Sequence, residues 1–203
     1  MRVVALSSHR SRVRVLCSAA MLALFAAVAV SAPSLAQAGP MSGATPAPGG
    51  QAAAPVSEAA TASVEIAGGT VDVRYNTPHM RGRKIMGELV PYGQVWRTGA
   101  NPATTLITSV PLKFGDLLVP AGTHTIYTLP SADTWQLIIN NQTGQWGLTY
   151  TPSMDLGRTP MLKKALGSPQ EVMSISFENS TPDATEMHVR WETTDVWVKV
   201  AKP

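Results

Sequence analysis

Cysteine is almost absent from this chain of 203 residues. The only one, Cys17, lies near the start of an N-terminal apolar run. The run, residues 15–30, follows four arginines and leads to the small-residue triplet Ala36-Gln37-Ala38, which is the order of a secretory signal. A retained membrane anchor is the alternative, but the run is shorter than the roughly 20 residues that a spanning helix needs. We therefore expect residues 1–38 to be a cleaved secretory signal peptide. The mature protein would then have no disulfide and no thiol nucleophile, and its core must stabilise it.

A large excess of positive charge is also missing once the signal peptide is set aside. The chain has 16 Lys+Arg and 13 Asp+Glu. Four arginines and no acidic residue lie in residues 1–38, which leaves 12 basic against 13 acidic side chains. Binding of nucleic acid through bulk charge needs a basic footprint, so we expect no nucleic-acid partner. We expect a periplasmic or extracellular protein with no membrane span after cleavage.

Residues 39–62 contain no aromatic residue and almost no large apolar one. Alanine, proline and glycine are abundant there. Such a segment buries too little surface to offset the cost of ordering, which predicts a disordered tether. The remaining residues, 63–203, have the size of one domain with a core of its own.

Short β-patterns fill this domain, as where Val71, Val73 and Tyr75 alternate with polar residues. They predict an all-β fold, a two-sheet antiparallel sandwich of jelly-roll type with nine or ten strands, and an open barrel is the less favoured alternative. Only residues 161–166 look helical, since Gly167 follows in the position of a C-terminal cap. The last predicted strands are residues 146–150, 171–178, 186–191 and 196–200.

Motifs for several common chemistries are absent. There is no Gly-x-Ser-x-Gly or Ser-x-x-Lys pattern, no nucleotide-binding glycine loop, and no pair of histidines at metal-ligand spacing. We therefore expect no metal and no cofactor. Whether the protein is an enzyme stays open, and a non-enzymatic role is favoured.

The residues with the most chemical character are gathered in residues 75–105, a segment broken by glycine and proline. Ordered loops of this length are usually functional, and guanidinium groups bind carboxylates and phosphates while aromatic faces stack on sugars. We expect a small polar, anionic or carbohydrate ligand here. The candidate ligand-binding residues are Arg83, Tyr92, Trp96, Arg97, Asn101 and His124, and the weaker candidates are His79 and Trp146.

Each candidate also has a structural alternative. Tyr92 and Trp96 would cap a crossover that only packs on the sheet, and Arg97 is expected to pair with Glu88 or Asp72 and hold that crossover closed. The remaining tryptophans in apolar strands, Trp135, Trp191 and Trp197, are expected in the core.

The histidines suggest a different class of function. His79 and His124 would form an acid/base pair if they met at one end of the sandwich, because histidine titrates near neutral pH. His188 is expected to be an exposed strand residue.

The run GRKIMGELVPYGQVWRTGAN, residues 82–101, together with Ala103-Thr104-Thr105, closely resembles the hallmark of the bacterial family known as domain of unknown function 2911. The turn at residues 119–123 and the strand at residues 135–140 are similar to that family too, and the resemblance extends from about Val64 to the C-terminus. It implies a secreted or envelope-located β-rich protein, and the family has no established activity and offers no catalytic residues to carry over to this chain. Some members are lipid-anchored, but this chain lacks their cysteine, which implies a soluble or released protein.

Three functions follow as hypotheses. The leading one is a small-ligand binding or interaction module with its site at the 75–105 loop. The alternatives are an envelope hydrolase or isomerase that uses histidine acid/base chemistry, and a structural component of the envelope.

Overall fold

The computed structural model describes residues 57–203, in which every regular element is a strand apart from one 3-10 turn at Pro152–Met154. The all-β antiparallel class predicted from the β-patterns is confirmed. The predicted signal peptide lies outside the described residues, as does most of the tether. Strand β1 begins at Glu58 and pairs with β2 from there, so the prediction that the tether extends to residue 62 is wrong.

Nine strands make up the domain, and all of their pairings are antiparallel. Their bounds are β1 Glu58–Ile66, β2 Gly69–Thr77, β3 Thr104–Thr108, β4 Leu112–Phe114, β5 Leu117–Val119, β6 Gly122–Leu129, β7 Trp135–Asn140, β8 Asp155–Glu178 and β9 Ala184–Ala201. The strand order is β1-β2-β3-β6-β7-β8-β9-β4-β5. No pairing within residues 57–203 joins β1 to β5, so the sheet is not closed.

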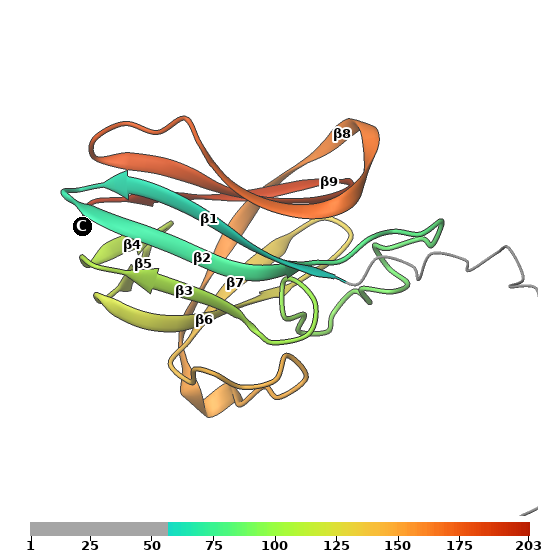
Figure 1. The fold of residues 1–203 in the computed structure, drawn as a ribbon, viewed down its shortest axis with the longest axis horizontal. Coiled ribbons are helices and arrows are strands. Elements are labelled where there is room, and N and C mark those ends of the chain that lie inside the picture. Colours follow the sequence, from blue (N-terminus) through green and yellow to red (C-terminus); the bar gives the residue numbers. More distant parts are fainter. Residues whose placement is uncertain (1–56) are drawn as a thin grey trace, which may run out of the picture. The chain divides into compact units, whose positions relative to one another are not determined.

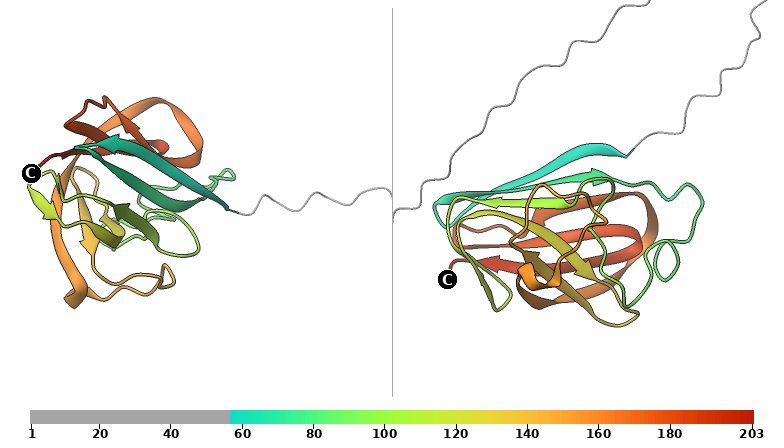
Figure 2. Two further views of the ribbon diagram at one scale, coloured as in Figure 1. Left: turned by 60° about the vertical axis from the view of Figure 1, so that its left-hand side comes forward. Right: turned by 90° about the horizontal axis from the view of Figure 1, so that it is seen from below.

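The sheet folds back over itself because β8 belongs to both layers of the domain (Figures 1 and 2). Residues 155–161 of β8 pair with β7, whereas residues 162–178 pair with β9. The two predicted sheets are therefore halves of one hydrogen-bonded sheet, β1-β2-β3-β6-β7 and β8-β9-β4-β5. The hydroxyl group of Tyr75 on β2 ties them together, since it accepts from the Ile175 amide at 3.0 Å and donates to the Ile175 carbonyl at 3.3 Å.

The core lies between the two halves and follows from side-chain alternation. On β2, Val71, Val73 and Tyr75 are buried, while Arg74 is exposed. Strand β7 is covered on both faces, because Leu137 and Ile139 belong to the main core and Ile138 packs in a second cluster with Tyr127. This covering is what the unbroken apolar run on β7 predicted.

Two local predictions are wrong. Residues 161–166 form the middle of β8 rather than a helix, because Met161 pairs with Trp135 and the next residue pairs with Trp197 of the other half. Gly167 lies where the pairing of β8 with β9 shifts register, between Ala165 and Gln170, so it marks a bulge and not a helix end.

The predicted strand at residues 146–150 is part of a loop instead, and the two predicted strands 186–191 and 196–200 are one continuous strand, β9. The loop covers the outer face of β6 and β7, where Tyr150 packs against Tyr127 with ring centroids 4.9 Å apart.

Candidate functional site

The connection between β2 and β3, residues 78–103, is held in place along its length. The amides of Ile85 and Met86 donate to the Glu192 carboxylate at 3.0 and 3.2 Å. Trp96 exchanges two backbone hydrogen bonds with Thr128 of β6, at 2.8 and 2.9 Å. The connection lies at the end of the sheet where β1 begins (Figure 1).

A pocket of about 300 Å³ opens between this connection and the start of β1. Five of the predicted site residues line it: His79, Arg83, Trp96, Arg97 and Asn101. Arg81, Ser57 and Trp191 line it as well, and no residue of the described lining is acidic. The pocket is therefore a basic one in a domain whose overall charge is nearly balanced.

Arg97 is the distinctive residue of this pocket. Its Nε is buried, and within residues 57–203 the atom has no hydrogen-bond partner. Burial lowers the pKa of Arg97 below its usual value, because the guanidinium loses hydration and gains no compensating anion. Arg97 lines the pocket as a partly exposed side chain, and its charge has no ion-pair partner among residues 57–203.

The expected ion pair between Arg97 and an acidic residue is wrong. Glu88 pairs instead with Lys84, whose Nζ lies 3.3 Å from its carboxylate on the exposed side of the loop. Asp72 accepts a hydrogen bond from Ser63 on the neighbouring strand at 2.6 Å. Both acids that the sequence offered to Arg97 therefore have other partners.

Arg83 and Arg81 have more constrained roles than Arg97. Arg83 donates from Nε to the Met80 carbonyl at 2.9 Å and from Nη2 to the His79 carbonyl at 2.7 Å, which fixes its guanidinium at the pocket rim. The Arg81 amide donates to the Glu171 carboxylate at 2.8 Å. These bonds hold the backbone and the Arg83 guanidinium in place at the pocket rim.

The backbone around Arg97 is strained. Arg81, Thr98 and Asn101 all have left-handed φ angles, of 51°, 55° and 59°. Such a φ is uncommon for a non-glycine residue and costly for a β-branched one such as Thr98. Thr98 is held in this conformation because its carbonyl accepts from the Thr104 hydroxyl at 2.8 Å. Strain of this kind concentrates at ligand sites, where the surrounding structure compensates for it.

A second loop packs against Arg97 and Asn101 without lining the pocket. Gly147 donates its amide to the Asn101 carbonyl at 3.1 Å, and a Cβ on this glycine would lie 2.0 Å from the Cδ of Arg97. Trp146, a weaker site candidate, forms a backbone bridge with Pro102 but is 56% exposed and does not line the pocket.

Two predicted site residues lie elsewhere. Tyr92 lines a separate hollow on the other side of the loop, with Met80 and Lys163. His124 is buried on β6, with its Nε2 3.1 Å from the Pro120 carbonyl oxygen.

The structure does not bring His79 and His124 together. The register places His124 opposite Leu106, which in turn pairs with Val73, and His79 comes six residues after Val73. At about 3.3 Å per extended residue, this offset corresponds to about 20 Å along the strand. The expected acid/base pair of these histidines is therefore wrong.

The family comparison agrees with the resemblance seen in the sequence. The model of the family described as protein of unknown function DUF2911 matches residues 57–200. This chain belongs to the DUF2911 family. No curated protein and no solved structure matches it.

The DUF2911 match begins one residue before β1 and ends one residue before the end of β9, so it includes the pocket lining and nearly all of the sheet. The family description names no activity, and the assignment of a function depends on the geometry of the site.

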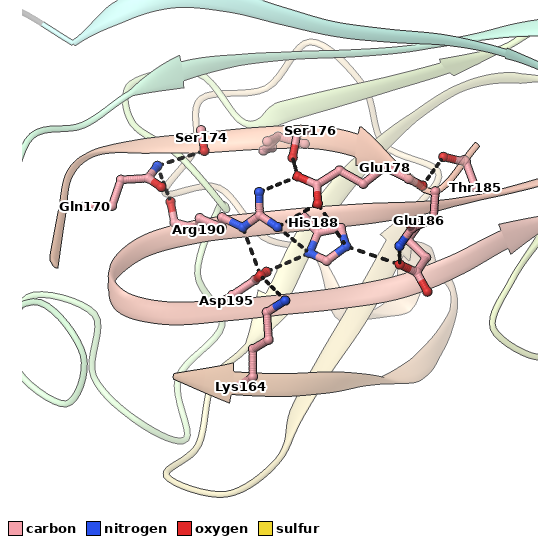
Figure 3. A network of polar contacts seen from close by, with 12 residues as sticks. Lys164, Gln170, Ser174, Ser176, Glu178, Thr185, Glu186, His188, Arg190 and Asp195 are labelled. Atoms are coloured by element: carbon pink, nitrogen blue, oxygen red, sulfur yellow. Dashed lines mark hydrogen bonds and ion pairs between the residues drawn. The ribbon is translucent and has the colours of Figure 1, made fainter. Parts of the chain in front are cut away.

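The DUF2911 domain also carries a polar cluster that the sequence did not reveal, on the outer face of β8 and β9 (Figure 3). Asp195 is fully buried there, and its two carboxylate oxygens accept from His188 Nδ1 at 2.8 Å and Arg190 Nε at 2.9 Å. Burial alone would raise the pKa of Asp195, but these hydrogen bonds outweigh it and hold the pKa below its usual value.

Glu178 is the second acid of this cluster. Arg190 binds it with both terminal nitrogens, and Nη2 lies 2.8 Å from Oε2. Because of these bonds, and despite partial burial, the pKa of Glu178 falls to about 2. Arg190 thus bridges two carboxylates and joins β8 to β9.

His188 and Trp197 differ from their predictions. His188 is 3% exposed rather than solvated, and its ring stacks on Trp197 with centroids 5.4 Å apart. Trp197 was expected in the core, but it lies partly exposed on this outer face, whereas Trp135 and Trp191 are buried as predicted. Alternation along a strand cannot distinguish a solvated outer face from one covered by its own charged neighbours.

Tyr150, Asp155 and Arg158 fix the loop that carries Gly147. The Tyr150 hydroxyl donates to Asp155 at 2.7 Å and accepts from Arg158 at 2.8 Å. Burial and the Asp155 carboxylate together raise the pKa of Tyr150 to about 12. The loop is therefore anchored at the base and presents Gly147 to Arg97.

Within residues 57–203, no group of three histidine, cysteine or acidic side chains has an arrangement that would hold a metal ion. The same part of the chain contains no helix of the length and apolarity that crossing a membrane requires.

Proposed function

We propose that this DUF2911 protein is a binding module for a small anion, and that the anion occupies the pocket beside Arg97. The observation that carries the proposal is the Arg97 guanidinium, whose buried Nε has no hydrogen-bond partner among residues 57–203, beside a pocket whose described lining contains no acidic residue. A buried donor left unsatisfied costs about 1–3 kcal/mol, and more when it is charged. An anion in the pocket beside Arg97 would offset the cost of burying this charge electrostatically.

The neighbouring groups support an anion over a neutral ligand. His79, Arg81 and Arg83 line the same pocket, and the Asn101 amide adds a neutral polar group. A guanidinium recognises carboxylate and phosphate oxygens through paired, directional hydrogen bonds. Among residues 57–203, the lining has a single histidine and no carboxylate or thiol, so these side chains favour electrostatic binding over paired acid/base catalysis.

Thermal unfolding in the presence of anions tests this function. The protein is titrated at constant ionic strength with acetate, benzoate, succinate, phosphate and sulfate, and with neutral benzamide. A ligand that binds only the native state stabilises it by about 2.7 kcal/mol at 100 times its Kd, which raises Tm by roughly 5–10 °C for a domain of this size.

Arg97→Met removes the charge and keeps an apolar stem, and Arg74→Met removes an exposed arginine on β2 outside this pocket. We expect at least one anion, and not benzamide, to raise the Tm of the wild type and of Arg74→Met but not that of Arg97→Met. Equal shifts in Arg97→Met would show that anions bind without Arg97, and no shift with any anion would favour a purely structural role; either result would overturn the proposal.

We also propose that the protein acts after export, in the periplasm or outside the cell. The order of arginines, apolar run and small-residue triplet in residues 1–38 supports this location. Mass spectrometry of the protein from fractionated cells tests it. Export predicts a species that begins at Gly39 outside the cytoplasm, and a full-length species confined to the cytoplasm would contradict it.

A further inference from the structure

The residues that line the pocket beside Arg97 are of two chemical kinds, which we call the cationic wall and the apolar wall. The cationic wall is formed by Arg81, Arg83 and Arg97, and His79 lines the pocket beside them. The apolar wall consists of Pro78, Leu89, Val90, Trp96, Ala100 and Trp191. Nearly half of the lining therefore offers no polar group to an inorganic anion.

The apolar wall is rigid. Trp96 stacks on Trp191 with centroids 5.9 Å apart and meets Trp135 edge to face at 6.3 Å. Val90 is buried, and its amide bonds to the Ile85 carbonyl at 2.9 Å. An apolar surface next to the Arg97 guanidinium, which has no partner among the described residues, is suited to a ligand with an anionic head and an apolar body.

We infer that the ligand is an amphipathic organic anion, a carboxylate or similar oxyanion attached to a compact apolar body, with its head at Arg97 and its body against Leu89, Val90 and Trp96. This inference rests on the proposed anion-binding function and narrows it. Sulfate or phosphate would contact only the cationic wall, and the apolar wall would stay hydrated.

The size of the pocket limits the body. A dry cavity of roughly 150 Å³ holds a benzene molecule. The pocket is about 300 Å³, so it holds a head group with a body of about one ring or a short chain. Affinity should rise with the length of the apolar chain and then level off once the pocket is full.

Isothermal titration calorimetry of the full chain with acetate, butyrate, hexanoate, decanoate, benzoate, sulfate and neutral hexanamide tests the inference. Each buried methylene contributes about 0.8 kcal/mol, which corresponds to about fourfold in affinity. We expect affinity to increase by up to this factor per methylene from acetate to hexanoate and to gain little more with decanoate. We expect hexanamide and sulfate to bind much more weakly than hexanoate.

Two leucine variants test whether the apolar wall contacts the apolar body of the ligand. Leu89 lines the pocket and is 46% exposed, and Leu118 on β5 is 54% exposed and lies outside it. Leu89→Ser should reduce the gain per methylene, and Leu118→Ser should leave it unchanged. Because both side chains are substantially exposed, neither change should unfold the protein.

The failures of the two claims are distinguishable. If acetate, hexanoate and sulfate bind with similar affinity and all require Arg97, the inference is overturned and the anion-binding function stands. If hexanoate binds as well to Arg97→Met, or no anion binds, both are overturned.

Discussion

Gly147 and Arg97 lie in such close contact that a Cβ on residue 147 would be 2.0 Å from the Cδ of Arg97 and 2.5 Å from the Asn101 carbonyl oxygen. The anchored loop over β6 and β7 thereby fixes the side chain whose charge defines the pocket. Only glycine permits this approach without displacing backbone atoms.

Gly147→Ala should therefore destabilise the protein and weaken anion binding together. Overpacking of this kind costs typically 1–3 kcal/mol, which urea unfolding will measure. Gly167→Ala is the matched control, because nothing lies within 4 Å of a Cβ there and the residue has no left-handed φ. A Gly147→Ala protein that unfolds and binds anions like the control would show that the contact has no role.

Arg97 and Arg190 should respond in opposite ways to the same substitution. Arg97→Met removes a charge with no partner among the described residues, so we expect the ligand-free stability to stay unchanged or to rise by up to about 1 kcal/mol. Arg190→Met removes the Arg190 hydrogen bond from the fully buried Asp195 and leaves it His188 and the ion pair with Lys164 at 3.4 Å, and we expect a loss of about 3 kcal/mol. Denaturant unfolding of the two variants in an anion-poor buffer measures both. A loss of 2 kcal/mol or more in Arg97→Met would show that Arg97 has a structural role.

Acid should weaken the protein partly through Glu178. Its pKa is about 2 in the folded state against 4.5 for the ordinary group, so it binds fewer protons when folded. Its stabilising contribution is present above about pH 4.5 and is lost as the pH falls through about 2. Because the side chain is 36% exposed, solvent screening reduces the contribution to about 1–2 kcal/mol.

Unfolding of Glu178→Gln between pH 7 and pH 2 checks this dependence. The variant should be less stable than the wild type at pH 7, and the two should converge towards pH 2. Glu88→Gln is the control, since the Lys84–Glu88 pair is largely exposed and should contribute little at any pH. A constant difference between Glu178→Gln and the wild type over the whole range would contradict the account.

Substitutions of Asn101 distinguish the effect of its left-handed backbone conformation from the effect of its side-chain amide. Its φ of 59° is accessible to glycine without strain, so Asn101→Gly should keep stability within about 0.5–1 kcal/mol while it removes the amide from the pocket. Asn101→Val should destabilise the protein by about 1–2 kcal/mol, because a β-branched residue tolerates this conformation poorly. Thermal unfolding distinguishes the two variants. Equal stability would show that the left-handed backbone relaxes at no cost.

The sequence predicts local features better than it predicts which strands pair with one another. The alternation of Val71, Val73 and Tyr75 predicts β2 because burial of every second side chain is a local pattern. The helix predicted at residues 161–166 fails because β8 changes partner from β7 to β9 there, and this change depends on the folding of the whole sheet.

For the candidate site, too, the sequence predicts local features better than contacts between distant segments. Composition located five of the lining residues in one loop, since cationic and aromatic side chains among glycines and prolines are a local signal. It did not show that Glu88 is taken by Lys84, nor that Arg81, Ser57 and Trp191 complete the pocket. These contacts join segments that are up to 134 positions apart, from Ser57 to Trp191, and no spacing rule connects them.

The most direct test of the central claim observes the Arg97 guanidinium itself. In the nitrogen-15 NMR spectrum, the Nε–Hε signal of Arg97 is assigned by its loss in Arg97→Lys, and benzoate is then added. The account predicts a saturable shift of this signal, while the Nε–Hε signal of Arg158, already bonded to Asp155, stays in place. An Arg97 signal that does not move at benzoate concentrations that shift other resonances would contradict it.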